Sequence, residues 1–460
     1  ISKGIINDEN SSKACVLNSK KMSGKISVAF AYLYSITADM EKTFSYGKAA
    51  MENLSEDDPL WFSWGWYSIG MAEMYRENFK ECILDLEKAL EYGKRSGNIY
   101  LITTIANRLS TLESRMGFYT SSYKKCSDLI TFMKASGYSQ IAKSECTYAG
   151  VYSSMAGIES MRTDFDDALE HIKTAYNLCK NESNITIKVH ILMVYSLALL
   201  GRGDLSGVKK MINEADIILK QNIVLPTTMS IYISSKGYML IEQNELEKAD
   251  HFFKENGLDY DKKIPYSHEH AYIDYARLLI LEMKFREAEI ILSKLLKMAQ
   301  DTNRIERIIE TKVVYAILNK ATGDKGKAIK NLIEALEDAA CEKILMSFVL
   351  FHSGISDLLK EVYMIQATSK TKIPRELIDK LKFAIEKREK FIKTNSESVL
   401  SDREIDVLKL ITGDLSNQEV ADKLFVSVNT VKTHVKSIFL KLGVDSRIQA
   451  VDKARERGIV

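Results

Sequence analysis

The sequence predicts an all-α protein: an α-solenoid of about eight helix pairs with a period of roughly forty residues, followed by a domain of four helices. Only 4 prolines occur in 460 residues, which suits long stretches of helix because proline breaks helix interiors. A short residue signature recurs along residues 26–367, and helix-capping residues cluster after residue 399. A hydrophobic content of 46% with 27% charged residues indicates a globular chain.

The signature begins with an anchor residue just after a polar turn. A small or compact residue follows three positions later, and an apolar or small residue seven positions after that. Clear copies begin at Phe79, Phe165, Leu205 and Phe285, a weaker one at Lys325, and degenerate ones at Met40, Tyr119 and Leu246. The residues before the anchors are typical of turns and N-caps, as in Glu77-Asn78, Thr163-Asp164, Gly203-Asp204, Asn244-Glu245 and Gly323-Asp324.

This pattern resembles tetratricopeptide repeats lengthened to about forty residues. The resemblance implies an α-solenoid with a concave surface suited to binding. The anchors themselves predict packing between helices and do not identify a ligand.

Basic residues outnumber acidic ones in the segment that follows the repeats. They are Lys370, Lys372, Arg375, Lys380, Lys382, Lys387, Arg388, Lys390 and Lys393. Leu377, Leu381 and Ile385 recur at helical spacing. The segment is interpreted as a short basic helix with a flexible hinge at 394–398, and its charges as a solvated face in preference to a second DNA contact.

Two capping boxes and a third cap predict the helices of the last domain. Ser401 with Glu404 begins the first helix, which Gly413 ends, and Ser416 with Glu419 begins a short second helix. Ser427 caps a third helix, which continues to residue 443. The second and third helices, joined at 425–427, form a predicted helix-turn-helix.

One face of the third helix carries an apolar stripe of Val428, Val431, Val435, Ile438 and Leu442. The opposite face carries Asn429, Lys432, Thr433 and Lys436 near the N-terminus of the helix. A recognition helix reads base edges in the major groove from its N-terminal part, where lysine can donate to guanine and a threonine methyl can meet thymine. Phosphate contacts are expected from Lys423, Lys441 and Arg447.

Residues 401–460 resemble the LuxR/NarL family of DNA-binding domains. The motifs that carry the resemblance are LSDREIDVLKLI, LSNQEVADKLFVSVNTVKTHVKSIFLKLGV and SRIQAV. It implies that Lys432, Thr433 and Lys436 read bases, and that Asn429, Thr430, His434 and Arg447 contact the DNA backbone or position helices. It also implies a structural role for Glu404, a turn at Gly443, and a dimerising helix at 447–457.

Repeats followed by such a domain resemble the C-terminal half of MalT-like, ATP-dependent activators. That resemblance implies a nucleotide-binding module before the repeats. These 460 residues contain no G-x-x-x-x-G-K-[ST] motif. The module is therefore expected to be missing by truncation or by ancestry, and a chain that begins at Ile1 without methionine favours truncation.

The expected domains are a lead-in (1–25), a repeat domain that acts as sensor or interaction surface (26–367), a basic helix and linker (368–398), and a LuxR-type helix-turn-helix (399–460). The expected function is sequence-specific, signal-responsive transcription regulation. Double-stranded DNA, a small-molecule or protein effector and a second copy of the chain on DNA are the expected partners. The alternative is a protein-interaction scaffold with weak, non-specific DNA binding.

Other signals are weaker. Trp61, Trp64 and Trp66 suit repeat packing, with an aromatic wall for a small effector as the alternative. His268 and His270 are interpreted as a surface loop in preference to a metal site, and the glycines at 201 and 203 as a repeat turn. No nucleophile–base constellation stands out, so no enzyme activity, cofactor or metal is expected.

Several features predict a cytoplasmic protein. The 6 cysteines are dispersed without a C-x-x-C pair, which is typical of reduced thiols. The richest apolar stretch, 191–200, is half as long as a membrane span. A net charge of +2 requires any DNA affinity to come from local charge placement.

Overall fold

The computed structural model describes residues 2–37, 39–135, 144–180, 184–368, 371–398, 400, 402–413, 415–442, 444–456 and 459. These residues form helices and no strand, as the sequence predicts. The chain divides into two compact units, Ile1–Ala384 and Ile385–Val460.

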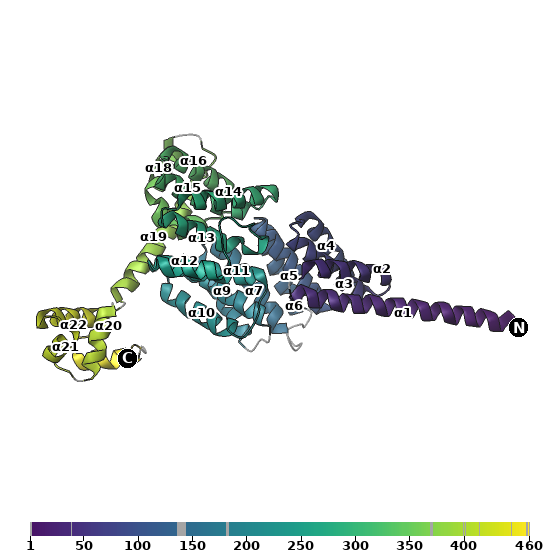
Figure 1. Cartoon of the computed structure of the whole chain (residues 1–460), viewed down its shortest axis with the longest axis horizontal. Helices are drawn as coiled ribbons and strands as arrows, with labels where there is room; N and C mark the ends of the chain where they lie inside the picture. Colours follow the sequence, from purple (N-terminus) through teal and green to yellow (C-terminus); the bar gives the residue numbers. More distant parts are fainter. Residues whose placement is uncertain are drawn as a thin grey trace. The chain divides into compact units, whose positions relative to one another are not determined.

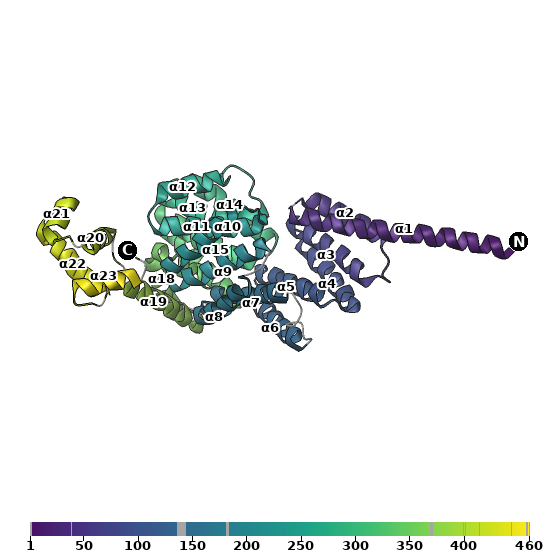
Figure 2. The same ribbon diagram turned by 90° about the horizontal axis from the view of Figure 1, so that it is seen from below.

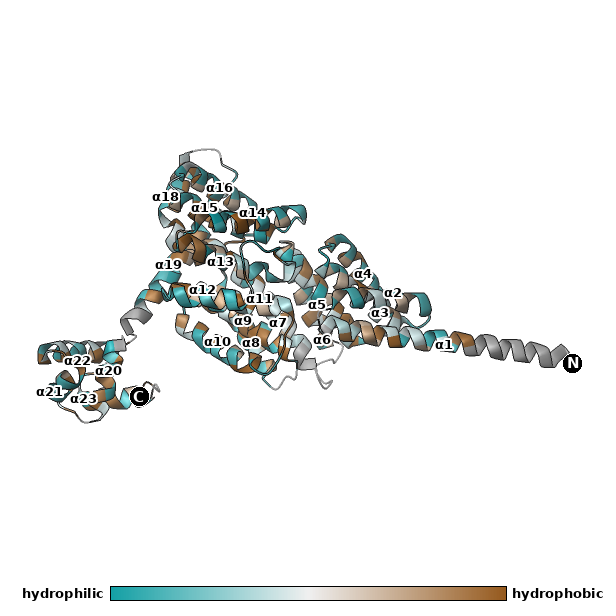
Figure 3. Cartoon of the chain, viewed as in Figure 1, coloured by the Kyte–Doolittle hydropathy of each residue, from teal (hydrophilic) through white to brown (hydrophobic). Residues whose placement is uncertain are grey.

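The first unit is a succession of paired helices (Figure 1). Its helices are α1 (Ser2–Ile36), α2 (Met40–Asn53), α3 (Pro59–Tyr75), α4 (Phe79–Ser96), α5 (Ile99–Arg115), α6 (Tyr119–Ala135), α7 (Ser144–Met161), α8 (Phe165–Leu178), α9 (Ile185–Arg202), α10 (Leu205–Leu219), α11 (Pro226–Glu242), α12 (Leu246–Glu255), η2 (Tyr266–His268), α13 (Glu269–Leu281), α14 (Phe285–Asp301), α15 (Ile305–Ala321), α16 (Lys325–Ala339), α17 (Met346–Leu350) and α18 (His352–Thr368). Most of these helices carry both apolar and polar residues, as expected of helices with one buried face and one exposed face (Figure 3).

The repeat register predicted from the sequence is confirmed. Each of the eight anchors is the first residue of the second helix of a pair, from Met40 in α2 to Lys325 in α16. The residue three positions after the anchor is fully buried in the five clearer copies, at Cys82, Ala168, Val208, Ala288 and Ala328. A compact side chain is needed there because the two helices of a pair approach each other closely.

The turns within the pairs share one backbone conformation. The residue two positions before the anchor is left-handed in every pair where that residue is described, with φ between 59° and 90°, at Glu77, Gly117, Thr163, Gly203, Asn244, Met283 and Gly323. The next N–H then reaches back to a carbonyl five residues earlier, as from Asn78 to Glu73 at 3.0 Å. This is the Schellman ending of a helix, in which glycine is favoured but not obligatory.

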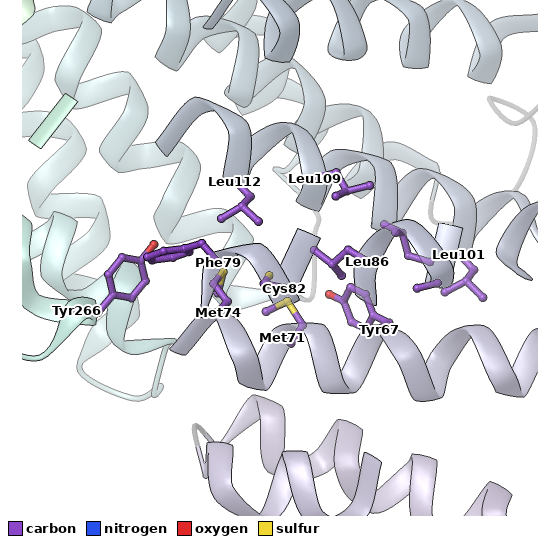
Figure 4. Close-up of a cluster of buried hydrophobic side chains, with 12 residues drawn as sticks. Tyr67, Met71, Met74, Phe79, Cys82, Leu86, Leu101, Leu109, Leu112 and Tyr266 are labelled. Atoms are coloured by element: carbon purple, nitrogen blue, oxygen red, sulfur yellow. The ribbon is translucent and has the colours of Figure 1, made fainter. Parts of the chain in front are cut away.

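The solenoid also makes contacts between pairs that are far apart in the sequence. Phe79 at the start of α4 packs edge-on against Tyr266 in η2, with ring centroids 5.3 Å apart (Figure 4). The hydroxyl of Tyr119 at the start of α6 donates to Glu306 Oε2 in α15 at 2.7 Å. The second and third pairs therefore meet the seventh and eighth.

A similar contact joins the fourth pair to the end of the eighth. Arg162, directly after α7, lies 2.6 Å from the Glu342 carboxylate through Nη2 and donates from Nε to the Glu342 carbonyl at 3.0 Å. The N–H of Leu345 donates to the carbonyl of Met161 at 2.8 Å. Figure 2 shows α9 to α15 gathered into one body, consistent with a solenoid that curls back on itself.

The sequence suggested no apolar run long enough for a membrane. Among the described residues one helix, α9, is nevertheless long and apolar enough to span one by length and composition. Of its apolar window, 56% is buried inside the solenoid, where α9 packs against α7, α8, α10 and α11. Burial in the repeat core accounts for that composition.

The basic segment forms α19 (Arg375–Ser398). Its predicted apolar positions are confirmed, since Leu377, Leu381 and Ile385 are buried. The predicted hinge is wrong, because residues 394–398 continue the helix. No proline or glycine interrupts this segment, so the helix has no reason to end there.

Candidate nucleic-acid interface and solenoid interior

Four helices make up the rest of the second unit. They are α20 (Asp402–Thr412), α21 (Asn417–Leu424), α22 (Val428–Leu442) and α23 (Arg447–Glu456). Their shared core comprises Leu400, Val407, Leu408, Ile411, Val420, Ala421, Val431, Ile438, Leu442, Ala450 and Ala454. The predicted boundaries agree with these helices to within a residue or so.

The turn between α21 and α22 is built by local hydrogen bonds. The predicted box at the start of α21 is confirmed, because the Ser416 hydroxyl accepts from the Glu419 N–H and the Glu419 carboxylate accepts from the Ser416 N–H. Ser427 caps α22 by accepting from the Thr430 N–H at 3.1 Å. Between the two caps, Phe425 takes a left-handed conformation with φ 54°.

The N-terminal half of α22 presents polar side chains to solvent. Asn429, Lys432, Thr433 and Lys436 are exposed. On the other side of the helix, Val431, Ile438 and Leu442 are buried, while Val428 and Val435 are half-buried against the same core. Lys432 and Lys436 are one turn apart on this exposed face, so their side chains are neighbours on the helix surface.

Two of the expected phosphate contacts are engaged inside the domain. Lys441 Nζ lies 2.7 Å from Oε2 of Glu404, a carboxylate that is only 4% exposed and also accepts from Ser437 at 2.5 Å. Arg447 donates from Nη2 to the carbonyls of Ile411, at 3.2 Å, and Leu415. Both cations therefore hold helices of this domain together, and their expected phosphate contacts stay predictions.

The remaining expected positions are placed as follows. Lys423 is exposed on α21, whereas Thr430 and His434 are half-buried on α22. Ser401, the first residue of the predicted capping box, and Gly443 lie outside the described residues.

One positioning residue was missed by the sequence interpretation. Arg403 on α20 donates to the carbonyl of Leu424 at 2.6 Å, at the C-terminal end of α21. A cation is favourable beside the last carbonyls of a helix. Because that helix lies about twenty positions further along the chain, no local pattern could have revealed the contact.

The three tryptophans of α3 do not form a single wall. Trp64 packs edge-on against Tyr32 and Tyr67, with centroids 5.7 Å and 5.5 Å away, and Trp61 lies against Lys25. Trp66 alone lines a groove between α2, α3 and α4, which has a volume of about 530 Å³. Repeat packing accounts for the other two.

The surface loop expected at His268 and His270 is wrong. His268 ends the short helix η2, and His270 lines an internal cavity of the solenoid. The described residues contain no group of three or more side chains arranged to hold a metal ion. His270 instead accepts from Arg307 Nη2 at 2.9 Å, and burial together with that guanidinium holds its pKa well below the ordinary value.

Comparisons with known proteins match both parts of the chain. Residues 24–364 match the model of the MalT-like TPR region, and residues 398–454 match that of the bacterial regulatory proteins of the luxR family. The register of the solenoid and the geometry of α20 to α23 agree with these two matches.

Named relatives are transcriptional regulators. The chain is 29% identical over 192 residues to the HTH-type transcriptional regulator AlkS of Alcanivorax borkumensis, covering 40% of this chain and 21% of that protein. It is 29% identical over 207 residues to the HTH-type transcriptional regulator MalT of Yersinia pestis, covering 39% of this chain and 22% of that protein. The matched regions thus span about a fifth of these curated relatives.

A solved structure shares the fold of the repeats. A Rap protein complexed with Competence and Sporulation Factor superposes with a TM-score of 0.51 and 10% identity, over 81% of this chain and 99% of that one. The chain belongs to the MalT-like TPR family and carries a C-terminal helix-turn-helix domain of the luxR family of transcription regulators.

Proposed function

We propose that the chain binds specific DNA sequences through α22, with Lys432, Thr433 and Lys436 reading base edges in the major groove. The observation that carries this proposal is the exposure of these three residues on the N-terminal half of α22, opposite its buried stripe. The Thr433 hydroxyl donates to the Asn429 carbonyl at 2.9 Å. Its donor is thereby used within the helix, which suits a methyl contact with thymine.

The neighbouring groups have a phosphate-facing role in this proposal. Lys423 is exposed on α21, and the N-terminus of α22 presents backbone N–H groups, with Asn429 and Thr430 in its first turn. Helix N-termini favour phosphate. His434 positions α22, while Lys441 and Arg447 contribute to DNA binding mainly by holding α20, α22 and α23 together.

The solenoid would act as the sensor in a cytoplasmic regulator. An effector, either a small molecule or a protein, binds among the repeats and favours assembly of two or more copies, so that paired domains occupy adjacent half-sites. The support for a sensor is the length of the repeat array and the polar interior of its curled part.

Selection of bound fragments from a genomic DNA pool at about 150 mM salt tests the proposal. The parent chain should enrich a recurring motif. Lys432→Ala should lose about 1–3 kcal/mol of binding free energy and relax the preference at one position. Lys409→Ala, which removes an exposed lysine from α20, is the matched control and should keep the motif.

The competing function is a repeat scaffold with weak, sequence-blind DNA binding. It predicts that neither the parent nor any variant enriches a motif, and that Lys432→Ala and Lys409→Ala reduce DNA affinity equally. That outcome would remove the base-reading role of α22.

A further inference from the structure

A groove runs between α2, α3 and α4, where α3 packs against both of the other helices. Its volume of about 530 Å³ lies within the range of roughly 300–1,000 Å³ that is typical of small-molecule sites. The lining residues lie within 44–52 of α2, 66–73 of α3 and 81–88 of α4. Each helix thus contributes about two turns, which makes the groove about 11 Å long.

The two ends of the groove are distinct because α3 runs in the opposite direction to α2 and α4. Lys88, in the last turn of the lining on α4, places its ammonium 4.0 Å from the ring centroid of Trp66 at the start of the lining on α3. Met51 of α2 lies against the same part of α3. Glu52, the next residue, therefore lines this end of the groove, and Glu81 lines the other end.

The floor of the groove is apolar along most of its length. Ile69 at its centre is 4% exposed, and Met51 and Trp66 line it on either side. Leu84 is 56% exposed beside them, although it is apolar. Covering such a side chain is favourable, so the groove suits an extended aliphatic chain.

The charged residues of the groove are mostly acidic. Four carboxylates and two ammonium groups line it, which gives a formal charge of −2; they belong to Glu52, Glu73, Glu81, Asp85, Lys48 and Lys88. Glu73 is already engaged, because its carboxylate accepts from Asn78 at 2.6 Å. Glu52 and Glu81 are exposed on the rim, whereas Asp85 is 8% exposed. The remaining negative charge is therefore spread along the groove from end to end.

This distribution distinguishes between classes of cation. The described residues contain no group of three or more side chains arranged to hold a metal ion, so the carboxylates do not converge on one point. Glu81 and Asp85 are one turn apart on α4, and Glu52 lies at the opposite end of the groove from Glu81. Separate positive charges on one extended chain match this arrangement better than a compact divalent cation does.

Lys88 already occupies a position that a ligand ammonium would take. Its Nζ lies 4.0 Å from the Trp66 ring centroid and 3.5 Å from Asp85 Oδ1, a combination of cation–π attraction and charge pairing. The side chain of Lys88 is 48% exposed, so it can turn towards solvent. The groove would then lose one of its two positive charges, and its formal charge would change from −2 to −3.

We propose that this groove binds a linear aliphatic polyamine of the spermidine class, which carries three ammonium groups. One terminal ammonium pairs with Glu81, the middle one with Asp85, and the other terminal one with Glu52. The methylene groups between them cover Ile69 and Leu84. Binding in the groove does not depend on the proposed reading of DNA. It is measured without DNA, because polyvalent cations also bind nucleic-acid phosphates.

Calorimetric titration of the full chain with spermidine at about 150 mM salt tests the proposal. Spermidine should bind saturably at one site, and Mg²⁺ at equal concentration should not displace it. A diamine of the same length, 1,8-diaminooctane, lacks the middle ammonium and should bind about tenfold more weakly, because it loses a charged contact with buried Asp85. Putrescine, which is too short to reach both ends, should also bind about tenfold more weakly.

Lys88→Met should strengthen binding, which a loss of folding cannot do. The variant leaves the Trp66 ring and Asp85 open to the ligand, so spermidine affinity should rise about threefold. Lys94→Met, which removes an exposed lysine of α4 outside the groove, is the matched control and should leave the affinity unchanged.

Glu81→Gln should lower spermidine affinity about threefold, because it removes one exposed carboxylate from the rim. Glu87→Gln removes an equally exposed carboxylate of α4 that does not line the groove, and it should have no effect. Circular dichroism checks that each variant remains folded.

Several outcomes overturn the proposal: no saturable binding of spermidine, equal binding of spermidine and 1,8-diaminooctane, displacement by Mg²⁺, or equal affinities in Lys88→Met and Lys94→Met. Tighter binding of a lysine–leucine tetrapeptide than of spermidine would also overturn it, by assigning the groove to a basic protein segment. DNA selection is run separately. A DNA motif without spermidine binding contradicts this inference alone, and spermidine binding without a motif contradicts the proposed function alone.

Discussion

The ammonium of Lys441 and the carboxylate of Glu404 form an ion pair across the second unit, 2.7 Å apart, with the carboxylate almost completely buried. The pair joins the third helix of this unit to the first. Removing one partner of such a pair leaves an uncompensated buried charge, which is strongly destabilising.

Lys441→Met should therefore destabilise the helix-turn-helix by about 2 kcal/mol, discounted because the lysine is partly exposed. Hydrogen exchange of the α20 and α22 amides in the full chain measures the loss. The double variant Lys441→Met/Glu404→Gln should recover part of it, and Lys432→Ala should leave exchange unchanged. Unchanged exchange in Lys441→Met, with weaker binding of all DNA and a salt slope lower by about one, would make Lys441 a phosphate contact instead.

Gly117 and Gly323 provide a test of the solenoid's curl. Both occupy the left-handed turn position, with φ 89° and 86°. A β-carbon on Gly117 would come within 2.9 Å of the Ile305 Cβ, whereas nothing lies within 4 Å at Gly323. Gly323→Ala should cost about 1–2 kcal/mol through backbone strain alone. Gly117→Ala should cost clearly more and loosen the contact with α15.

Thermal melting and hydrogen exchange of α15 distinguish the two glycine variants. Faster exchange of α15 is expected only in Gly117→Ala. Equal melting temperatures for the two variants, with identical α15 exchange, would show that the approach of Gly117 to Ile305 contributes nothing to stability.

Met283 and Met364 are both exposed, but they lie in different backbone conformations. Met283 has φ 62° in a repeat turn and is 75% exposed, while Met364 is 61% exposed within α18. Met283→Gly should stabilise the chain by about 1 kcal/mol, because glycine adopts a positive φ without strain. Met364→Gly should destabilise it by a similar amount, because glycine weakens a helix interior. Melting shifts of the same sign would refute this argument.

His171 introduces a pH dependence into the fourth pair. Its Nδ1 lies 2.9 Å from the buried carboxylate of Glu159, and the hydrogen bond to that carboxylate raises the pKa of His171. The stabilisation is fully present below the unfolded pKa of about 6.5 and is lost as the pH rises through the higher folded value.

Protection of the α7 and α8 amides should accordingly fall by about 1 kcal/mol between slightly acid and alkaline pH, the worth of one charge-assisted hydrogen bond. His171→Gln should remove this slope and match the parent at alkaline pH. A slope that survives in the variant would assign the pH dependence to another group.

Local patterns predicted the fold well where the determinants are local. The anchors, the turn residues before them and the cap at Ser416 act within a few positions, and the structure has all of them in the expected register. The predicted hinge at 394–398 was wrong because the local sequence was misinterpreted. Polar composition at 394–398 was interpreted as flexibility, although nothing in it opposes helix formation.

The candidate sites also differ in whether their determinants are local in the sequence. The exposed face of α22 follows from helical spacing on one segment, so Lys432 and Lys436 were predictable. The cavity beside His270 is lined by Arg115, Glu269 and Arg304, which come from three different pairs. A spacing pattern within one segment does not predict how a solenoid curls, so this cavity could not be predicted. The structural partners of Lys441 and Arg447 were hidden for the same reason, since each lies on another helix.

The curl of the solenoid bears on how the chain is made. An array with contacts only between neighbours can fold pair by pair as it leaves the ribosome. Here the hydrogen bond from Tyr119 to Glu306 cannot form until Glu306, 187 positions later, has been synthesised. Contacts between positions so far apart in the sequence also form slowly. The early pairs can assemble during synthesis, but the cavity cannot close before α15 has been translated. The interior of the curled solenoid is thus complete only in chains that have been synthesised through α15.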